Sequence, residues 1–308
     1  MNAFKGKNKR ILADISKSWQ LYVFLLPCIT YFVVFHYMPL YGIQIAFRDY
    51  KIAFGITGSK WVGFDQFKTF FESYYFTRLL ANTFLLNLYG LLAGFPMPII
   101  LALLLNRILS KRFKKFTQTV IYIPHFISMV VMAGMLYIFL SPTNGILNSF
   151  IQAIGGKPIY FMVEPDMFRP IYIISGIWQS AGWGTILYLA SLTGIDQELY
   201  EAAEIDGASI LQKILHIDIP SIIPIMTMVF ILDCGRLLSS NTEKALLLQT
   251  PGNIAVSDVI GVYVYNIGLG KAQFSYTAAI GLFINLINFI MILTVNQISK
   301  KLSNTYLF

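Results

Sequence analysis

Charged residues, cysteine and histidine are all scarce in this sequence. Only 12% of its 308 residues are charged and 56% are hydrophobic, whereas soluble domains carry about 25% charged residues. So few charges cannot form the water-facing surface of a soluble globule, and the composition predicts a polytopic membrane protein. Cys28 and Cys234 lie in apolar stretches far apart in the sequence, so neither a disulfide framework nor a metal-binding spacing is indicated.

Motifs for nucleotide binding and catalysis are also missing. The pairs Gly156-Lys157 and Gly270-Lys271 lack both the upstream glycine and the following Ser or Thr of a phosphate-binding loop. His36, His125 and His216 fall on three separate segments, which supports neither a zinc site nor an activated nucleophile. We therefore predict no catalytic residue, no metal site and no cofactor bound by this chain.

Long apolar stretches dominate what is present. A transmembrane helix needs about 20 mostly apolar residues, and uncharged windows of that length cover 19–41, 80–105, 118–140, 170–192 and 275–298. A sixth apolar stretch, 220–238, carries Asp233 and Arg236 near its distal end. The sequence thus predicts an all-α integral membrane protein with six transmembrane helices over 19–298, preceded by a basic leader, 1–18, and followed by a short tail, 299–308.

The positive charges predict the orientation of these spans. The formal net charge is +8, and basic residues gather in the leader and again after the second span. Because Lys and Arg accumulate on the cytoplasmic side, we expect both termini to be cytoplasmic. The same charges favour an anionic membrane face over nucleic acid as the partner. Outside, short interfacial helices are expected within 42–79 and at 146–154, and a longer polar connection at 239–274 with a turn at 251–253.

The segment DQELYEAAEIDGASILQKILHIDIP, residues 196–220, is the most informative one. Asp196 is a natural N-cap and Gly207 can end a helix, so a short helix, a glycine turn and a second amphipathic piece are predicted. Ala202 and Ala203 keep the first helix thin enough to enter a groove on another protein. Glu201 and Glu204 supply charges for basic residues in that groove.

This segment resembles the EAA loop of the membrane permease subunits of binding-protein-dependent ABC importers. Glu201-Ala202-Ala203, Gly207, Ile217 and Pro220 have the spacing of that loop, with Ile219 in place of the usual leucine. The resemblance implies a type I importer permease fold and a loop, 196–219, that couples to an ATPase. The residues implied in coupling are Glu201, Ala202, Ala203, Glu204, Asp206, Gly207, Ile217 and Pro220.

Two further stretches are similar to the carbohydrate branch of these permeases, the multiple-sugar or polysaccharide type. They are Trp61–Phe67 followed by Asn82-Thr83, and the run 261–290. The resemblance implies an oligosaccharide substrate and a bacterial cell membrane location. It also implies a heterodimer with a second permease of similar fold, two cytoplasmic ATPase subunits that bind ATP and Mg, and an extracytoplasmic sugar-binding protein.

Polar residues within the spans are candidates for the sugar path, because amides and aromatic faces bind sugars. Gln179 and Trp183 lie on one face of the fourth span, and Asn285 and Asn288 on one face of the sixth; interhelical packing is the alternative role. Asp233 and Arg236 are either a structural ion pair or a gate contact. Because the spans contain no cluster of cations, a neutral oligosaccharide is expected.

Other functions remain open at this point. The chain could be a permease of the same family for a non-sugar solute, or a membrane-embedded enzyme acting on lipid-linked sugar, which would need paired carboxylates or a metal cluster. A secondary transporter would need an ionisable residue at mid-membrane. Asp233 alone comes near to that, and the EAA pattern would then be unexplained.

Overall fold

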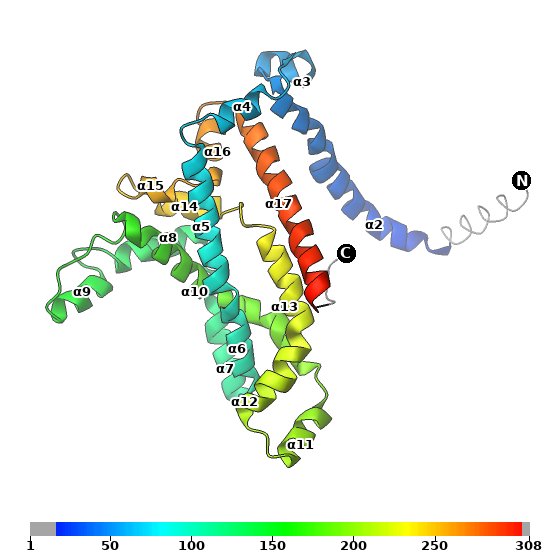
Figure 1. Ribbon diagram of the computed structural model, residues 1–308, viewed down its shortest axis with the longest axis vertical. Coiled ribbons are helices and arrows are strands. Elements are labelled where there is room, and N and C mark those ends of the chain that lie inside the picture. Colours follow the sequence, from blue (N-terminus) through cyan, green and yellow to red (C-terminus); the bar gives the residue numbers. More distant parts are fainter. Residues whose placement is uncertain (1–16, 304–308) are drawn as a thin grey trace, which may run out of the picture. The chain divides into compact units, whose positions relative to one another are not determined.

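The computed structural model describes residues 17–303, so most of the predicted leader and the end of the predicted tail lie outside the described residues. The regular structure of these residues is helical apart from one two-stranded sheet (Figure 1). It divides into two compact units. The first contains the residues up to Thr69 together with Gln273–Leu282, and the second contains Phe70–Ala272 and the residues from Phe283 onward.

The first unit begins with a long apolar helix. The elements of the first unit are α2 (Trp19–Phe32), η1 (Val33–Tyr37), η2 (Met38–Phe47), β1 (Arg48–Asp49), η3 (Ile52–Phe54), α3 (Gly55–Gly58), β2 (Lys60–Trp61) and most of α4 (Asp65–Phe71). No residue of α2 is buried, and Phe24 is 80% exposed. A helix that shows apolar side chains on all sides is suited to lipid.

The stretch Trp61–Phe67, which resembles sugar permeases, takes part in the two-stranded sheet and in an aromatic cluster. β1 and β2 pair antiparallel, with Arg48 opposite Trp61. Phe47 stacks on Trp61 at a centroid distance of 5.6 Å and also contacts Phe64 and Phe67. Trp61, Phe64 and Phe67 therefore form a small aromatic cluster around Phe47. This short sheet was not predicted, since interfacial helices alone were expected over 42–79.

The second unit is a bundle of long helices with shorter ones between them. Its elements are α5 (Phe76–Gly94), α6 (Pro96–Asn106), α7 (Lys111–Tyr122), η4 (Ile123–Phe126), α8 (Met129–Phe139), α9 (Ile146–Ala153), α10 (Pro165–Thr193), α11 (Gln197–Ile205), α12 (Ile210–Lys213), η5 (Ile214–Asp218), α13 (Ile219–Cys234), α14 (Thr242–Leu248), α15 (Ile254–Ser257) and α16 (Ile260–Gly268). α17 (Phe274–Ser303) runs through both units.

An apolar core joins α6, α10 and α13. Leu103, Leu192 and Ile222 are members of one buried cluster that these helices share. Gly182 lets α10 approach α7 closely, because a Cβ at that position would lie 1.9 Å from the carbonyl oxygen of Ile121. The cytoplasmic end predicted for the second, fourth and fifth spans is thus packed as one block.

Four helical stretches of the described residues are long and apolar enough to cross a membrane, at Trp19–Phe47, Phe76–Asn106, Ile210–Cys234 and Phe274–Lys301. The predicted third span is not a single straight helix: Lys111–Phe126 and Met129–Phe139 meet at an angle of 98°. α10 is long enough to cross a membrane, but its polar residues lower its mean hydropathy. A plan of six spans is compatible with this structure and stays a prediction.

The break in the third span has local causes. Pro124 lies in the 3₁₀ turn η4, Ile127 is extended, and the Ser128 hydroxyl accepts a hydrogen bond from Val131 N at 3.3 Å to begin α8. Gln179 of α10 stabilises the break, since its Nε2 donates to Ile127 O at 2.8 Å. Proline, followed by a serine cap, is a sequence signal that could have revealed this break.

The connection 239–274 is packed into the second unit, which the sequence did not indicate. Ala245, Leu248, Val259 and Val262 are buried in a second apolar cluster. The predicted turn is present, with Asn253 N donating to Thr250 O at 3.2 Å. The predicted helix at 146–154 is α9, and its apolar side chains are largely exposed.

Candidate functional site

The EAA segment, residues 196–220, forms α11, α12 and η5 and leads into α13. Figure 1 shows α11 and α12 at the same end of the second unit as α6 and α7. The Asp196 carboxylate accepts a hydrogen bond from Glu198 N at 3.1 Å, so the predicted N-cap is confirmed. Glu201 and Ala202 are exposed on α11, whereas Ala203 is half-buried.

Gly207 ends α11 with the backbone conformation that a glycine favours. Its φ is +73°, and nothing lies within 4 Å of the place where a Cβ would be. Ala208 N donates to Ala203 O at 2.8 Å, and Gly207 N donates to Glu204 O at 3.0 Å. These two bonds form a Schellman motif, which defines the direction in which the chain leaves α11. Asp206, the C-cap residue, is exposed.

A salt bridge ties α11 to the next helix, which begins with a capping box. Lys213 Nζ lies 2.6 Å from Glu204 Oε1, and the Lys213 side chain is buried. Ser209 and Gln212 form a reciprocal capping box that begins α12. α11 is therefore held against α12 by contacts within the segment itself.

Asp218 joins the EAA segment to the end of the second predicted span. Its side chain is fully buried and accepts hydrogen bonds from Tyr200 Oη of α11 and from Arg107, the C-cap residue of α6. The Arg107 guanidinium also lies over the Tyr200 ring, at 5.3 Å. Burial, together with the Asp218 carboxylate, raises the pKa of Tyr200 to about 12, so the phenol remains a donor. Arg107, Tyr200 and Asp218 were not identified from the sequence.

Ile217 and Pro220 lie where the EAA segment continues into α13. Ile217 is half-buried in the π-helical turn η5, and Pro220 is exposed in the first turn of α13. A proline lacks the N–H that continues a helical ladder, and a π turn just before it accommodates the lost bond. The segment therefore passes into α13 without a break in the helix.

The EAA segment leaves apolar side chains open beside its acidic ones. Leu199, Ile205, Ile210 and Leu211 are all exposed, Ile205 at 87%. A mixture of exposed apolar and charged groups on a short rigid helix is typical of a protein-binding surface.

A cavity of about 880 Å³ lies in the second unit, lined mainly by α5, α10 and the end of α13. Gln179 and Trp183 line it, as do Asp233 and Arg236. Trp183 is stacked on His125 with ring centroids 4.5 Å apart. The helix α13 ends at Cys234, so Arg236 follows the helix in a turn, and its backbone N donates to Asp233 O at 3.0 Å.

The two asparagines of α17 differ from each other and do not line this cavity. Asn288 is buried, and its side chain accepts a hydrogen bond from Leu238 N at 3.2 Å and donates one to Ser239 Oγ at 2.8 Å. Asn285 is exposed. Asn288 therefore joins α17 to the turn that follows α13.

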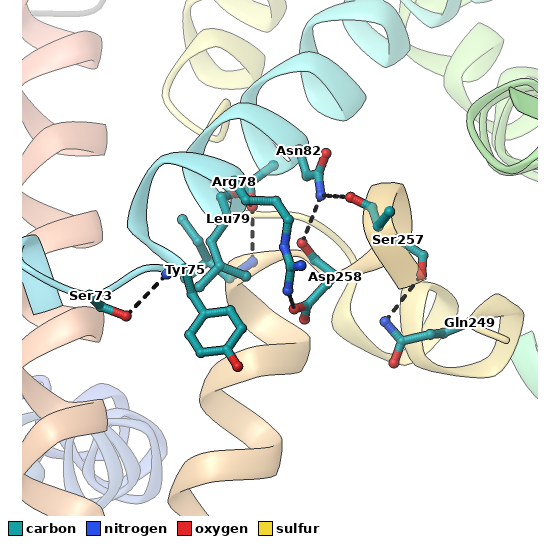
Figure 2. A network of polar contacts seen from close by, with 11 residues as sticks. Ser73, Tyr75, Arg78, Leu79, Asn82, Gln249, Ser257 and Asp258 are labelled. Atoms are coloured by element: carbon teal, nitrogen blue, oxygen red, sulfur yellow. Dashed lines mark hydrogen bonds and ion pairs between the residues drawn. The ribbon is translucent and has the colours of Figure 1, made fainter. Parts of the chain in front are cut away.

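A network of polar contacts secures the 239–274 connection to α5. Figure 2 shows Arg78 and Asn82 reaching Asp258; Arg78 lies 2.9 Å from its carboxylate, and Asn82 Nδ2 donates to its carbonyl oxygen at 3.2 Å. Thr83 Oγ1 accepts from Ile260 N at 2.9 Å. Asn82 and Thr83, noted in the sequence for their resemblance to sugar permeases, thus hold α15 and the start of α16 against α5.

The family is settled by comparison with known proteins. The family model described as "Binding-protein-dependent transport system inner membrane component" matches residues 94–304. The chain belongs to this family. It is therefore a multi-pass permease component of such a transport system, and the matched region contains the whole EAA segment.

Several relatives are similar over nearly the whole permease chain. The polygalacturonan/rhamnogalacturonan transport system permease protein YteP of Bacillus subtilis is 42% identical, over 96% of this chain and 92% of the relative. The arabinooligosaccharides transport system permease protein AraP of the same organism is 30% identical over 94% and 90%. The crystal structure of a bacterial alginate ABC transporter, in complex with an alginate pentasaccharide-bound periplasmic protein, matches with a TM-score of 0.88 and 40% identity, covering 97% of this chain and 100% of the other. The type I importer permease fold is thereby confirmed.

Proposed function

We propose that this permease forms half of the translocation path of an ATP-driven importer for an oligosaccharide. The observation that carries the proposal is the EAA segment: an exposed helix, α11, is held rigidly by Asp218 and Lys213 to the ends of two long helices. A lever of this kind transmits movement from a bound ATPase to the bundle. The chain has no phosphate-binding loop of its own, so ATP and Mg belong to the partner ATPases.

A carbohydrate is the solute that the relatives support best. YteP is named for polygalacturonan and rhamnogalacturonan, AraP for arabinooligosaccharides, and the structural relative for alginate. In this chain Gln179 and Trp183 give the cavity an amide and an aromatic face. Both groups suit sugar rings.

The proposed assembly contains four kinds of protein. A second permease of similar fold completes the path, because one chain supplies one wall of an alternating-access cavity. Two ATPase subunits dock on the EAA segments from the cytoplasm, and an extracytoplasmic sugar-binding protein delivers the solute. The structural relative was crystallised with a saccharide-loaded periplasmic protein, which supports the last of these partners.

Substitution of an alanine on the exposed face of α11 tests the docking step. Ala202 is exposed within this chain, so Ala202→Trp should leave the permease folded and hold α11 out of the groove on the ATPase. Overpacking costs about 1 to 3 kcal/mol, which weakens association roughly tenfold or more. Recovery of the ATPase with the purified permease is the measurement, and Ala202→Ser is the matched control. Full recovery with Ala202→Trp would remove the basis for calling α11 a docking helix.

A further inference from the structure

One cation of the 239–274 connection is buried beside the cavity and has no acidic partner there. Lys244 is 3% exposed, and its Nζ donates to Tyr172 O at 2.6 Å and lies 4.6 Å from the centre of the Tyr172 ring. Burial lowers the pKa of Lys244 to about 7, and desolvation is the cause. A nearby carboxylate would oppose that shift.

The fold makes room for this ammonium group. An ideal Cβ at Gly176 of α10 would lie 2.9 Å from Lys244 Nζ, so any side chain at that position would compete with the cation for space. The Asn241 side chain accepts from Lys244 N at 3.0 Å and begins α14. Tyr172 Oη of α10 donates to Asn241 O at 3.4 Å, which ties the start of α14 to α10. Lys244 is thus a positioned group.

The charges around the cavity leave this cation uncompensated. Of the residues that line the cavity in the described part of the chain, Asp233, Arg236 and Lys244 are charged. Asp233 and Arg236 are three residues apart and of opposite sign, so they offset one another. The net charge of the lining is therefore positive and is located at Lys244, where an unpaired buried ion is costly.

We propose that Lys244 binds a carboxylate of the solute, which makes the transported saccharide a uronic-acid-containing oligosaccharide. This inference rests on the proposed function, because it takes the cavity as part of the sugar path. When no solute is bound, the Tyr172 ring and carbonyl hold the Lys244 ammonium. A carboxylate of the bound solute then supplies the missing counter-ion. The earlier expectation of a neutral solute overlooked Lys244, because that residue lies outside the predicted spans.

Equilibrium binding to the purified complete transporter, without its binding protein, tests this site. The probes are a digalacturonate and its dimethyl ester, which differ in charge but have the same sugar rings. We expect the wild type to bind the acid at least about tenfold more tightly than the ester. Lys244→Met should abolish that preference. The control Lys157→Met, at an exposed lysine, should retain it.

Each outcome bears on the carboxylate site. A wild type that binds acid and ester equally, or binds neither, contradicts the proposal even if Lys244→Met fails to assemble. A Lys244→Met complex that keeps the preference also contradicts it. If these results occur in a transporter that still takes up some carbohydrate in an ATP-dependent manner, the proposed function stands and this inference alone fails.

Discussion

Asp218 is the residue on which the EAA segment depends most. It is buried between α11 and the end of α6 and is bonded to Tyr200 and Arg107. The Asp218 carboxylate holds α6 and α11, which are far apart in the sequence, to the start of α13. The ion pair is therefore a structural contact between the EAA segment and the end of α6.

Removal of this carboxylate should destabilise the permease strongly. Asp218→Ala leaves the Arg107 charge without its partner, and breaking a buried ion pair costs about 3 to 5 kcal/mol. Thermal unfolding of the purified complex measures the effect. Asp206→Ala, at the exposed C-cap of the same segment, is the control and should change little. Equal melting temperatures for Asp218→Ala and Asp206→Ala would show that the buried pair contributes nothing.

The salt bridge between Glu204 and Lys213 should respond to acid. Lys213 lowers the pKa of the Glu204 carboxyl, mainly through their hydrogen bond. A depressed pKa in the folded state means that the pair stabilises above the ordinary carboxyl value of 4.5 and that this contribution is lost as pH falls through the folded value. The difference in melting temperature between wild type and Glu204→Gln should be present near about pH 6 and shrink as the pH is lowered below 4.5. A melting-temperature difference between wild type and Glu204→Gln that grows on acidification would contradict this prediction.

At the scale of the element, the direction of α11 depends on one glycine. Gly207 has a φ of +73° and open space around its α-carbon, so a substitution there meets backbone strain and no steric clash with neighbours. The left-handed region costs most non-glycine residues about 1 to 2 kcal/mol, and asparagine enters it more readily than valine does.

We therefore expect Gly207→Val to uncouple ATP hydrolysis from uptake while some ATPase remains bound. Gly207→Asn should retain most of the coupling. The ratio of solute imported to ATP hydrolysed, measured in the same reconstituted preparation, distinguishes the two. If Gly207→Val and Gly207→Asn both give the wild-type ratio of solute imported to ATP hydrolysed, the turn at Gly207 has no part in coupling.

Local sequence signals predicted the elements of the EAA segment because capping is a local property. Asp196 and Gly207 each act on backbone groups within a few residues, and both were identified from the sequence. Asp218 was missed because its partners, Tyr200 and Arg107, are 18 and 111 residues away. Lys244 was missed for a similar reason, since its position beside the cavity depends on α10, where its partner Tyr172 is 72 residues away.

At the scale of the whole molecule, hydropathy predicted most of the long helices but not their irregularities. Windows of apolar residues located α2, α5 with α6, α13 and α17. The 98° break between η4 and α8 lies inside the single apolar window 118–140, so hydropathy alone did not reveal it. The connection 239–274 looked like a polar loop, yet it buries Val259 and Val262 completely, because short amphipathic helices give a weak signal in a long window.

The predicted orientation can be tested by labelling single cysteines from outside the cell. In a background without the two native cysteines, positions Lys60 and Lys157 should react with an impermeant reagent. Positions Lys114 and His216 should react only after the membrane is opened, because positive clusters favour the cytoplasmic side. Labelling of position 216 in intact cells would place the EAA segment on the wrong side for docking.

The most direct test of the central claim is solute uptake by proteoliposomes that contain this permease, its sister permease and the ATPase, with the loaded binding protein outside. The account predicts that a labelled oligosaccharide accumulates only when ATP is enclosed with the ATPase on the cytoplasmic face. It also predicts that Ala202→Trp abolishes this accumulation while Ala202→Ser does not. Accumulation without ATP, or full accumulation with Ala202→Trp, would contradict the account.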